Sequence, residues 1–180
     1  MGEATVVLRI TIIVVFLVAA VLAFAATKPK TFHLRRSITI KAAPDKVFAL
    51  VNDFHKWNEW SAEDSNDPNI QRTFGGAAAG EGAVSEWHGS GKIGAGRMLI
   101  TESIPNQKIS VTVDFVKPFT ARNANVFTFE PAEGSTNVTW DFTGTYVYVL
   151  KVMSIFVSMD RIMGQHFEKG LENLKRVAER

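Results

Sequence analysis

Between residues 70 and 143, strand-like segments follow one another so closely that few folds remain available to the chain. Apolar residues occupy alternate positions, as in Val111, Val113 and Phe115, which is typical of strands with one buried face. Glycine- or proline-containing turns separate the segments, and no helical pattern intervenes. Parallel strands need long crossovers, so this spacing predicts an antiparallel meander. The six expected strands are residues 70–74, 83–88, 97–104, 108–116, 123–129 and 136–143.

The residues before this meander predict one more strand and two short helices. Residues 34–41 (LRRSITIK) alternate between polar and apolar side chains, as a strand does. Pro44 and Asp45 suit the first turn of a helix, because proline is tolerated there and a carboxylate complements the helix dipole. Residues 53–60 (DFHKWNEW) indicate a second short helix, whose aromatic side chains pack inward.

Apolar residues recur at three- and four-residue intervals over residues 149–178, which predicts one long C-terminal helix. Its first half, up to Met159, is apolar nearly all round, so we expect it to be deeply covered. Gly164 and Gly170 lie in the second half, and each costs helix stability, about 1 kcal/mol relative to alanine. We expect another backbone to approach closely at these glycines.

An apolar run occupies residues 6–26, with Arg9 as its only charge. About 20 helical residues at roughly 1.5 Å rise span a hydrocarbon core of about 30 Å, so residues 4–26 are expected to form a transmembrane anchor. A cleaved signal peptide is the alternative, because Ala23-Phe24-Ala25 fits a small-x-small cleavage site. The length of the run, and Glu3 without any lysine ahead of it, favour the anchor.

Basic residues crowd the C-terminal side of this run: Lys28, Lys30, Arg35 and Arg36. The other side offers Arg9 and the amino terminus, so the positive-inside rule favours a cytoplasmic position for the rest of the chain. The exported side stays open as the alternative. We expect residues 27–33 to be a linker, whose basic groups are able to rest on anionic headgroups. Residues 34–180 are expected to form one domain.

Charge and composition exclude several classes of function. The chain has 20 Lys and Arg against 18 Asp and Glu, so no strong field favours nucleic acid as a partner. It has no cysteine, which rules out disulfides, thiolate metal sites and cysteine nucleophiles. The four histidines are scattered without metal-ligand spacing, so we expect no metal site. No pattern indicates a cofactor.

Two short motifs have simpler interpretations than the sites they resemble. Residues 89–94 (GSGKIG) match G-x-G-x-x-G, but a strand follows instead of a helix, so we expect a hairpin turn and no nucleotide site. Residues 63–67 are acidic, but they lack the ligand spacing of a calcium-binding EF-hand loop. We therefore expect a solvated loop there.

Several short segments in combination carry a resemblance to a known superfamily. They are SITI at 37–40, AAPDKVF at 42–48, Asp53-Phe54 with Trp57 and Trp60-Ser61, GAG at 94–96, FEP at 129–131, Thr139-Trp140, and FEKGL with a later leucine at 167–174. From Leu34 to the C-terminus the chain resembles the START/Bet v 1-like (SRPBCC) superfamily, and within it the polyketide cyclase/dehydrase-like group. The resemblance implies an α+β helix-grip fold, in which a curved antiparallel sheet of about seven strands wraps around the C-terminal helix. It also implies an apolar cavity between sheet and helix.

The residues expected to line this cavity come from the small helices, the sheet and the long helix. They are Trp57, Trp60, Trp87, Val113, Phe115, Phe127, Phe129, Trp140, Met153, Phe156, Met159, Met163 and Phe167. Such a site takes up an apolar small molecule or a lipid, and the anchor holds it beside the bilayer. The alternative is a solid core, because methionine suits both arrangements. The sequence does not indicate an oligomeric state.

An enzyme of the polyketide cyclase or dehydratase type is the other functional hypothesis, although no recognisable catalytic set is present. His88, on an expected strand, is a candidate acid or base if it projects into the cavity. Asp160 is a candidate base or ligand contact, and Arg97 is the third polar candidate. The structural alternatives are a surface position for His88 and an ion pair of Asp160 with Arg161 or with a sheet residue such as Arg97.

Overall fold

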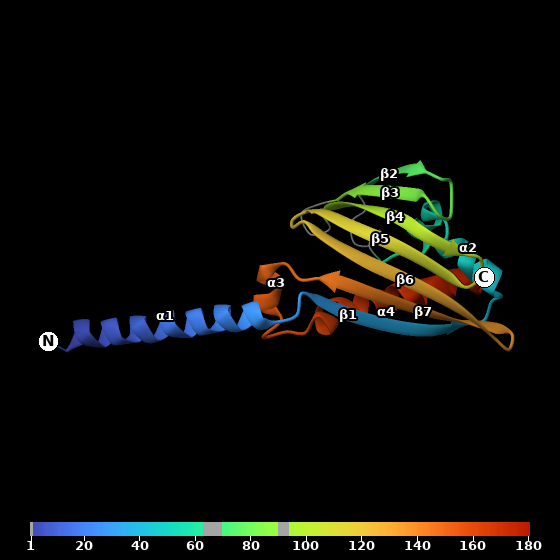
Figure 1. Cartoon of the computed structure of the whole chain (residues 1–180). Coiled ribbons are helices and arrows are strands. Elements are labelled where there is room, and N and C mark those ends of the chain that lie inside the picture. The colour runs from blue at the N-terminus through green and yellow to red at the C-terminus, as the bar shows by residue number, and fades with distance from the viewer. Residues whose placement is uncertain (1, 63–69, 90–93) are drawn as a thin grey trace.

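The computed structural model describes residues 2–62, 70–89 and 94–180, and it has the α+β helix-grip architecture expected from the sequence (Figure 1). Within these residues, seven antiparallel strands form one curved sheet in the order β1-β7-β6-β5-β4-β3-β2. The strands are β1 (Thr31–Ile40), β2 (Gln71–Gly76), β3 (Ala83–His88), β4 (Ala95–Ile104), β5 (Lys108–Lys117), β6 (Ala121–Ala132) and β7 (Ser135–Thr145). The helices are α1 (Glu3–Thr27), α2 (Pro44–Val51), the 3-10 helix η1 (Phe54–Glu59), α3 (Tyr148–Met153) and α4 (Met159–Ala178).

The sheet is the expected meander, because each strand from β2 to β7 pairs with the next one in the sequence. The first strand completes it: Thr31 of β1 lies opposite Thr145 of β7, at the start of a ten-residue antiparallel register. Residues 31–33 of the expected linker therefore belong to the sheet. The strand bounds differ from the expected ones by at most three residues.

Two short helices cover one part of the sheet's inner face. Pro44 begins α2, which packs on β6 and β7. The second helix is a 3-10 helix, and its tryptophans tie it to α2. The indole N–H of Trp57 donates to the Val51 carbonyl at 2.9 Å, and that of Trp60 donates to the Leu50 carbonyl at 3.1 Å. These bonds satisfy carbonyls near the end of α2, which have no partner within the helix.

The prediction of a single helix over residues 149–178 is wrong, because α3 ends at Met153 and α4 begins at Met159. The backbone N–H of Arg161 donates to the Ser158 hydroxyl at 3.2 Å, so Ser158 caps a new helix. The expected burial of the apolar first half is also wrong. No residue of α3 is buried, and Phe156 in the connection is 72% exposed. This segment packs beside α1 instead of under the sheet (Figure 1).

The N-terminal helix α1 projects away from the sheet as a long rod (Figure 1). Its most apolar 18-residue window has a mean hydropathy of 3.0, and it is the one helix in the described residues that is long and apolar enough to cross a membrane. A signal sequence has the same properties. Ala25, near the end that contacts α3, is the only buried residue described in α1.

Candidate ligand-binding site

Alternate residues of the strands face the inner side of the curved sheet. The buried ones include Leu34 and Ile40 on β1, Ala83, Ser85 and Trp87 on β3, Met98 and Ile100 on β4, Ile109, Val111 and Val113 on β5, Asn125, Phe127 and Phe129 on β6, and Thr136, Val138, Trp140 and Phe142 on β7. The inner face is therefore apolar over most of its area. The residues between them on each strand are more exposed, as expected for a sheet with one covered face.

Aromatic rings fill the part of the interior that lies under α2, η1 and α4. Trp140 is at the centre of this cluster, with its ring centroid 4.8 Å from that of Phe127, 4.5 Å from Phe167 and 6.0 Å from Trp60. Trp57 joins the cluster through Trp60, at 4.8 Å between centroids. Rings at these separations are in contact, so this part of the interior is solid.

The position of Trp140 depends on a hydrogen bond and on a glycine. Its indole N–H donates to Asn125 Oδ1 at 2.6 Å, which satisfies both buried polar groups. A Cβ at Gly170 would lie 3.1 Å from the ring, so glycine lets α4 approach it. At Gly164 the neighbour is the Arg36 side chain. We expected a backbone at both glycines, and this is wrong: side chains make the close approach.

A second aromatic pair lies further along the sheet. Trp87 of β3 packs edge-on against Phe115 of β5, with 5.4 Å between ring centroids. The Trp87 ring crosses β4 at Gly96, where a Cβ would collide with it and with the Asp114 carbonyl oxygen. Glycine at this position therefore allows the ring to lie flat over the strand.

The two aromatic groups leave a stretch of smaller side chains between them. Trp87 on β3 and Trp140 on β7 are four strands apart, about 19 Å along the sheet at about 4.8 Å per strand. The inner face between them carries Met98, Val111 and Val113, which are shorter than the rings on either side. This stretch, named here the aliphatic floor, is the candidate site for an apolar ligand.

Ser85 borders the aliphatic floor and provides a polar group there. It lies opposite Met98 in the β3–β4 register and is fully buried. Its Oγ has no hydrogen-bond partner among the residues that the structure describes. Buried hydroxyls in proteins normally bond to protein, ordered water or ligand, so this atom suits a polar group of a bound molecule. Sequence reasoning missed it, although a serine between Ala83 and Trp87 on an apolar face was a visible signal.

Most of the residues expected to line a cavity do lie in the interior. Trp57, Trp60, Trp87, Val113, Phe127, Phe129, Trp140, Met159 and Phe167 are buried, and Phe115 and Met163 are half-buried. The remaining two expected residues, Met153 and Phe156, do not lie on the inner face. Met153 is 48% exposed and Phe156 is 72% exposed, because the helix break removes them from the face that α4 turns inward.

The three polar candidates for catalysis lie apart from the interior. His88 and Arg97 are exposed residues that alternate with buried Trp87 and Met98 on their strands, so both face outward. The Arg97 guanidinium Nε is 3.5 Å from the Glu86 carboxylate. Asp160 is exposed at the start of α4. The structure therefore does not assemble these three side chains into a site.

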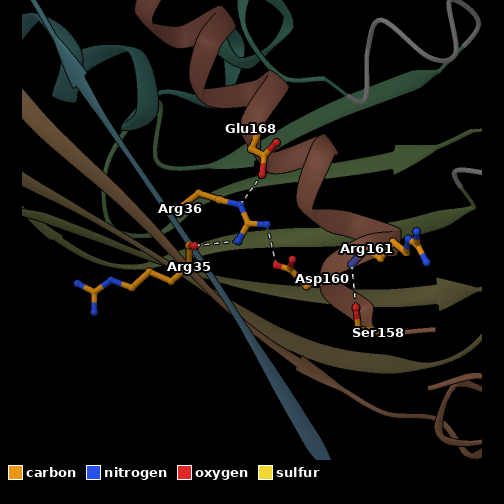
Figure 2. Close-up of polar contacts among 6 residues, drawn as sticks. All are labelled: Arg35, Arg36, Ser158, Asp160, Arg161 and Glu168. Carbon is orange, nitrogen blue, oxygen red and sulfur yellow. Dashed lines mark hydrogen bonds and ion pairs between the residues drawn. The ribbon is translucent and has the colours of Figure 1, made fainter. Parts of the chain in front are cut away.

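Asp160 instead takes part in an ion-pair network that joins α4 to β1 (Figure 2). Arg36 Nη2 donates to Asp160 Oδ1 at 2.6 Å, and Arg36 Nε donates to Glu168 Oε1 at 2.8 Å. Hydrogen bonds to Asp160 and then Glu168 raise the pKa of Arg36, so the guanidinium stays charged. An ion pair with a sheet residue was one expected alternative for Asp160, and the partner is Arg36 of β1 and not the example Arg97.

Other motifs from the sequence add no site. In the described part of the chain, no group of three or more His, Asp or Glu side chains is arranged to hold a metal ion. The acidic loop 63–67 lies outside the described residues, as do residues 90–93 of the glycine-rich motif.

The family comparison agrees with this architecture. A family model described as polyketide cyclase / dehydrase and lipid transport matches residues 31–179. The match begins at β1 and includes the whole sheet and α4, whereas α1 lies outside it. No curated protein matches the chain.

Solved structures share the fold at low sequence identity. Protein CV1439 from Chromobacterium violaceum is 14% identical with a TM-score of 0.58, over 85% of this chain and 99% of that one. The Aha1 dimer from Colwellia psychrerythraea is 17% identical with a TM-score of 0.58, over 82% and 96%. Ara h 8.0201 is 13% identical with a TM-score of 0.52, over 83% and 95%. At these identities the likeness concerns the fold alone.

Proposed function

Because the chain belongs to the polyketide cyclase / dehydrase and lipid transport family, we propose that it binds an apolar small molecule or lipid between its sheet and α4. The observation that carries the proposal is the buried Ser85 Oγ, which lacks a partner among the described residues on a mostly apolar face. A mostly apolar lining with few polar groups is typical of sites for small apolar ligands.

The aliphatic floor suggests how such a ligand lies. Its hydrocarbon part rests on Met98, Val111 and Val113, between Trp87 on one side and Trp140 on the other. A hydroxyl, carbonyl or carboxyl group of the ligand bonds to Ser85 Oγ. Each buried CH₂ contributes about 0.8 kcal/mol, so a ten-carbon chain gains about 8 kcal/mol before the entropy cost of binding.

The proposal also includes α1 as the anchor that keeps this site beside a membrane. Its mean hydropathy of 3.0 and its nearly charge-free length support an anchor, and the basic residues after it support a cytoplasmic domain. The intact mass of the protein isolated from membranes separates the two alternatives. A chain that begins after Ala25 would mean a cleaved signal peptide.

Ligand binding is tested by a substitution that places a large side chain on the aliphatic floor. In Val113→Trp, an indole occupies the middle of the aliphatic floor; in the control Thr112→Trp, the same residue points outward from the same strand. Full-length proteins are purified in mild detergent and extracted with organic solvent, and the extracts are compared by mass spectrometry. We expect one apolar species at near one per chain in the wild type and in the control, and its loss in Val113→Trp. Equal extracts from all three would contradict the proposal, because lipid held by α1 alone does not depend on Val113.

The cyclase or dehydratase hypothesis gains no support from the described residues. His88, Arg97 and Asp160 are exposed, and Asp160 is engaged by Arg36. Acid–base catalysis on a bound ligand needs a titratable group within hydrogen-bond reach of it.

A further inference from the structure

The connection between β7 and α4 carries an exposed apolar surface. Its members, named here the α3 surface, are Tyr148, Val149, Met153, Phe156 and Val157. All five are exposed, and Phe156 is the most exposed at 72%. Several large apolar side chains exposed within one short segment suggest a surface that binds a protein or a membrane.

The composition of the segment around the α3 surface also indicates a contact with an apolar phase. Residues 142–159 contain a single charged residue, Lys151, and no acidic one. An apolar segment with basic groups around it is the composition of helices that lie in the boundary layer of a bilayer. Lys28 and Lys30 follow α1 immediately and add to the positive charge beside the α3 surface.

The α3 surface is continuous with the end of α1. The Tyr148 hydroxyl donates to the Leu22 carbonyl at 2.7 Å, and Lys151 Nζ donates to the Lys28 carbonyl at 3.1 Å. Tyrosine is enriched at the level where hydrocarbon meets headgroups, since its ring prefers the apolar side and its hydroxyl the polar side.

The length of α1 also places the contact between Tyr148 and Leu22 near the boundary between hydrocarbon and headgroups. Twenty residues span about 30 Å of hydrocarbon, and counted from Val6 they end at Ala25. Leu22 lies three residues before that point, about 4.5 Å inside the boundary. A helix that is bonded to Leu22 is therefore held close to the boundary between hydrocarbon and headgroups.

A second exposed apolar group occurs at the same end of the molecule. Val116 and Phe119, at the turn between β5 and β6, are 61% and 49% exposed. This turn and α3 both lie at the end of the domain from which α1 departs (Figure 1). Ile104, at the turn between β4 and β5, lies at the opposite end (Figure 1).

We propose that the α3 surface inserts into the boundary layer of the bilayer in which α1 is anchored, and so holds the end of the domain from which α1 departs against the membrane. This inference rests on the anchor proposed above. The bilayer is favoured over a second copy of the chain because any bilayer around α1 necessarily adjoins a helix that is hydrogen-bonded to its last turns.

The absence of cysteine allows a direct test on the full chain. Single cysteines replace Phe156 or Met153 on the α3 surface, Ile104 as an exposed apolar control, and Val14 in the middle of α1. Each variant is labelled with an environment-sensitive fluorophore and reconstituted in phosphatidylcholine vesicles. Quenching is then measured with nitroxide-bearing lipids and, separately, with iodide present on both sides of the membrane.

We expect the labels at 156 and 153 to be quenched by the nitroxide lipids about fivefold more than the label at 104, and to be shielded from iodide. Equal quenching at 156, 153 and 104 would overturn the inference. Shielding from both quenchers would also overturn it, and would indicate a second copy of the chain on this surface. The label at Val14 tests separately whether α1 spans the bilayer. If the nitroxide lipids do not quench this label, the proposed membrane anchor is wrong, independently of the quenching at 156 and 153.

Discussion

Glycines at a few positions make room for large side chains inside this protein. Gly96 lies under the Trp87 ring, and Gly170 faces the edge of Trp140. Because interiors are close-packed, one added methyl group at such a place forces a ring or a backbone to move. The two tryptophans on either side of the aliphatic floor thus depend on residues that have no side chain.

Gly96→Ala tests this dependence at Trp87. The new Cβ would overlap both the Trp87 ring and the backbone oxygen of Asp114, so we expect a loss of about 1–3 kcal/mol in the free energy of unfolding. Denaturant unfolding followed by tryptophan fluorescence measures it. Gly75→Ala, where no atom lies within 4 Å of the added Cβ, is the matched control and should change stability little. A similar loss in both variants would show that the Trp87 contact is not responsible.

The helix α4 is held on β1 by charged groups along its length. Arg36 of β1 binds Asp160 and Glu168, and the backbone N–H of Lys41 donates to Glu179 Oε1 at 2.8 Å near the other end. These bonds fix the distance between α4 and the edge of the sheet.

Arg36→Met keeps the apolar stem and removes the ion pairs. Arg36 is 24% exposed, so its pairs are partly shielded from water, and we expect a loss of about 1 kcal/mol in unfolding free energy. Arg35→Met is the control, because that side chain is 71% exposed and its Nε lies 3.6 Å from Asp141. High salt should reduce the difference between the wild type and Arg36→Met. Equal stability of the two variants would contradict the role of Arg36.

The Glu179 carboxylate makes the free energy of unfolding depend on pH in the acidic range. The hydrogen bond from the Lys41 backbone N–H lowers the pKa of Glu179 below its usual value. The unfolded chain then binds more protons near that pKa, so the stabilisation is present above the unfolded pKa and is lost as the pH falls through the folded one. In Glu179→Gln we expect the melting temperature to fall less steeply between about pH 5 and pH 3. Glu172→Gln on the same helix serves as control, and a slope reduced equally in both would contradict this assignment.

The strands of this protein were more predictable from the sequence than the helices, for a physical reason. Alternation reports which face of a strand is buried, so the meander and the inward residues such as Val113 and Phe127 were predictable. A segment that is apolar all round, such as residues 149–157, does not report what covers it. Burial under the sheet and exposure at the surface leave the same pattern, so Met153 and Phe156 were assigned to the wrong place. Ser158 ahead of Asp160 was a capping signal that marks the break.

The whole molecule combines a domain of the polyketide cyclase / dehydrase and lipid transport family with an apolar helix and an apolar surface at the same end. In the proposed arrangement, α1 and the α3 surface hold the domain on the bilayer, and the aliphatic floor takes up a molecule from it. Part of the candidate site was accessible from the sequence: its aromatic walls follow from alternation and from the family resemblance. The polar group of Ser85 was not, because its significance depends on the lack of a partner among the described residues, which only three-dimensional packing reveals.

The most direct test of the ligand-binding account is a high-resolution crystal structure of the full chain, purified with its native lipids and refined around Ser85. We expect elongated density over Met98, Val111 and Val113, with one polar atom within about 3 Å of Ser85 Oγ. The account would be contradicted by side chains that close over the aliphatic floor and leave Ser85 bonded to protein or to a single water.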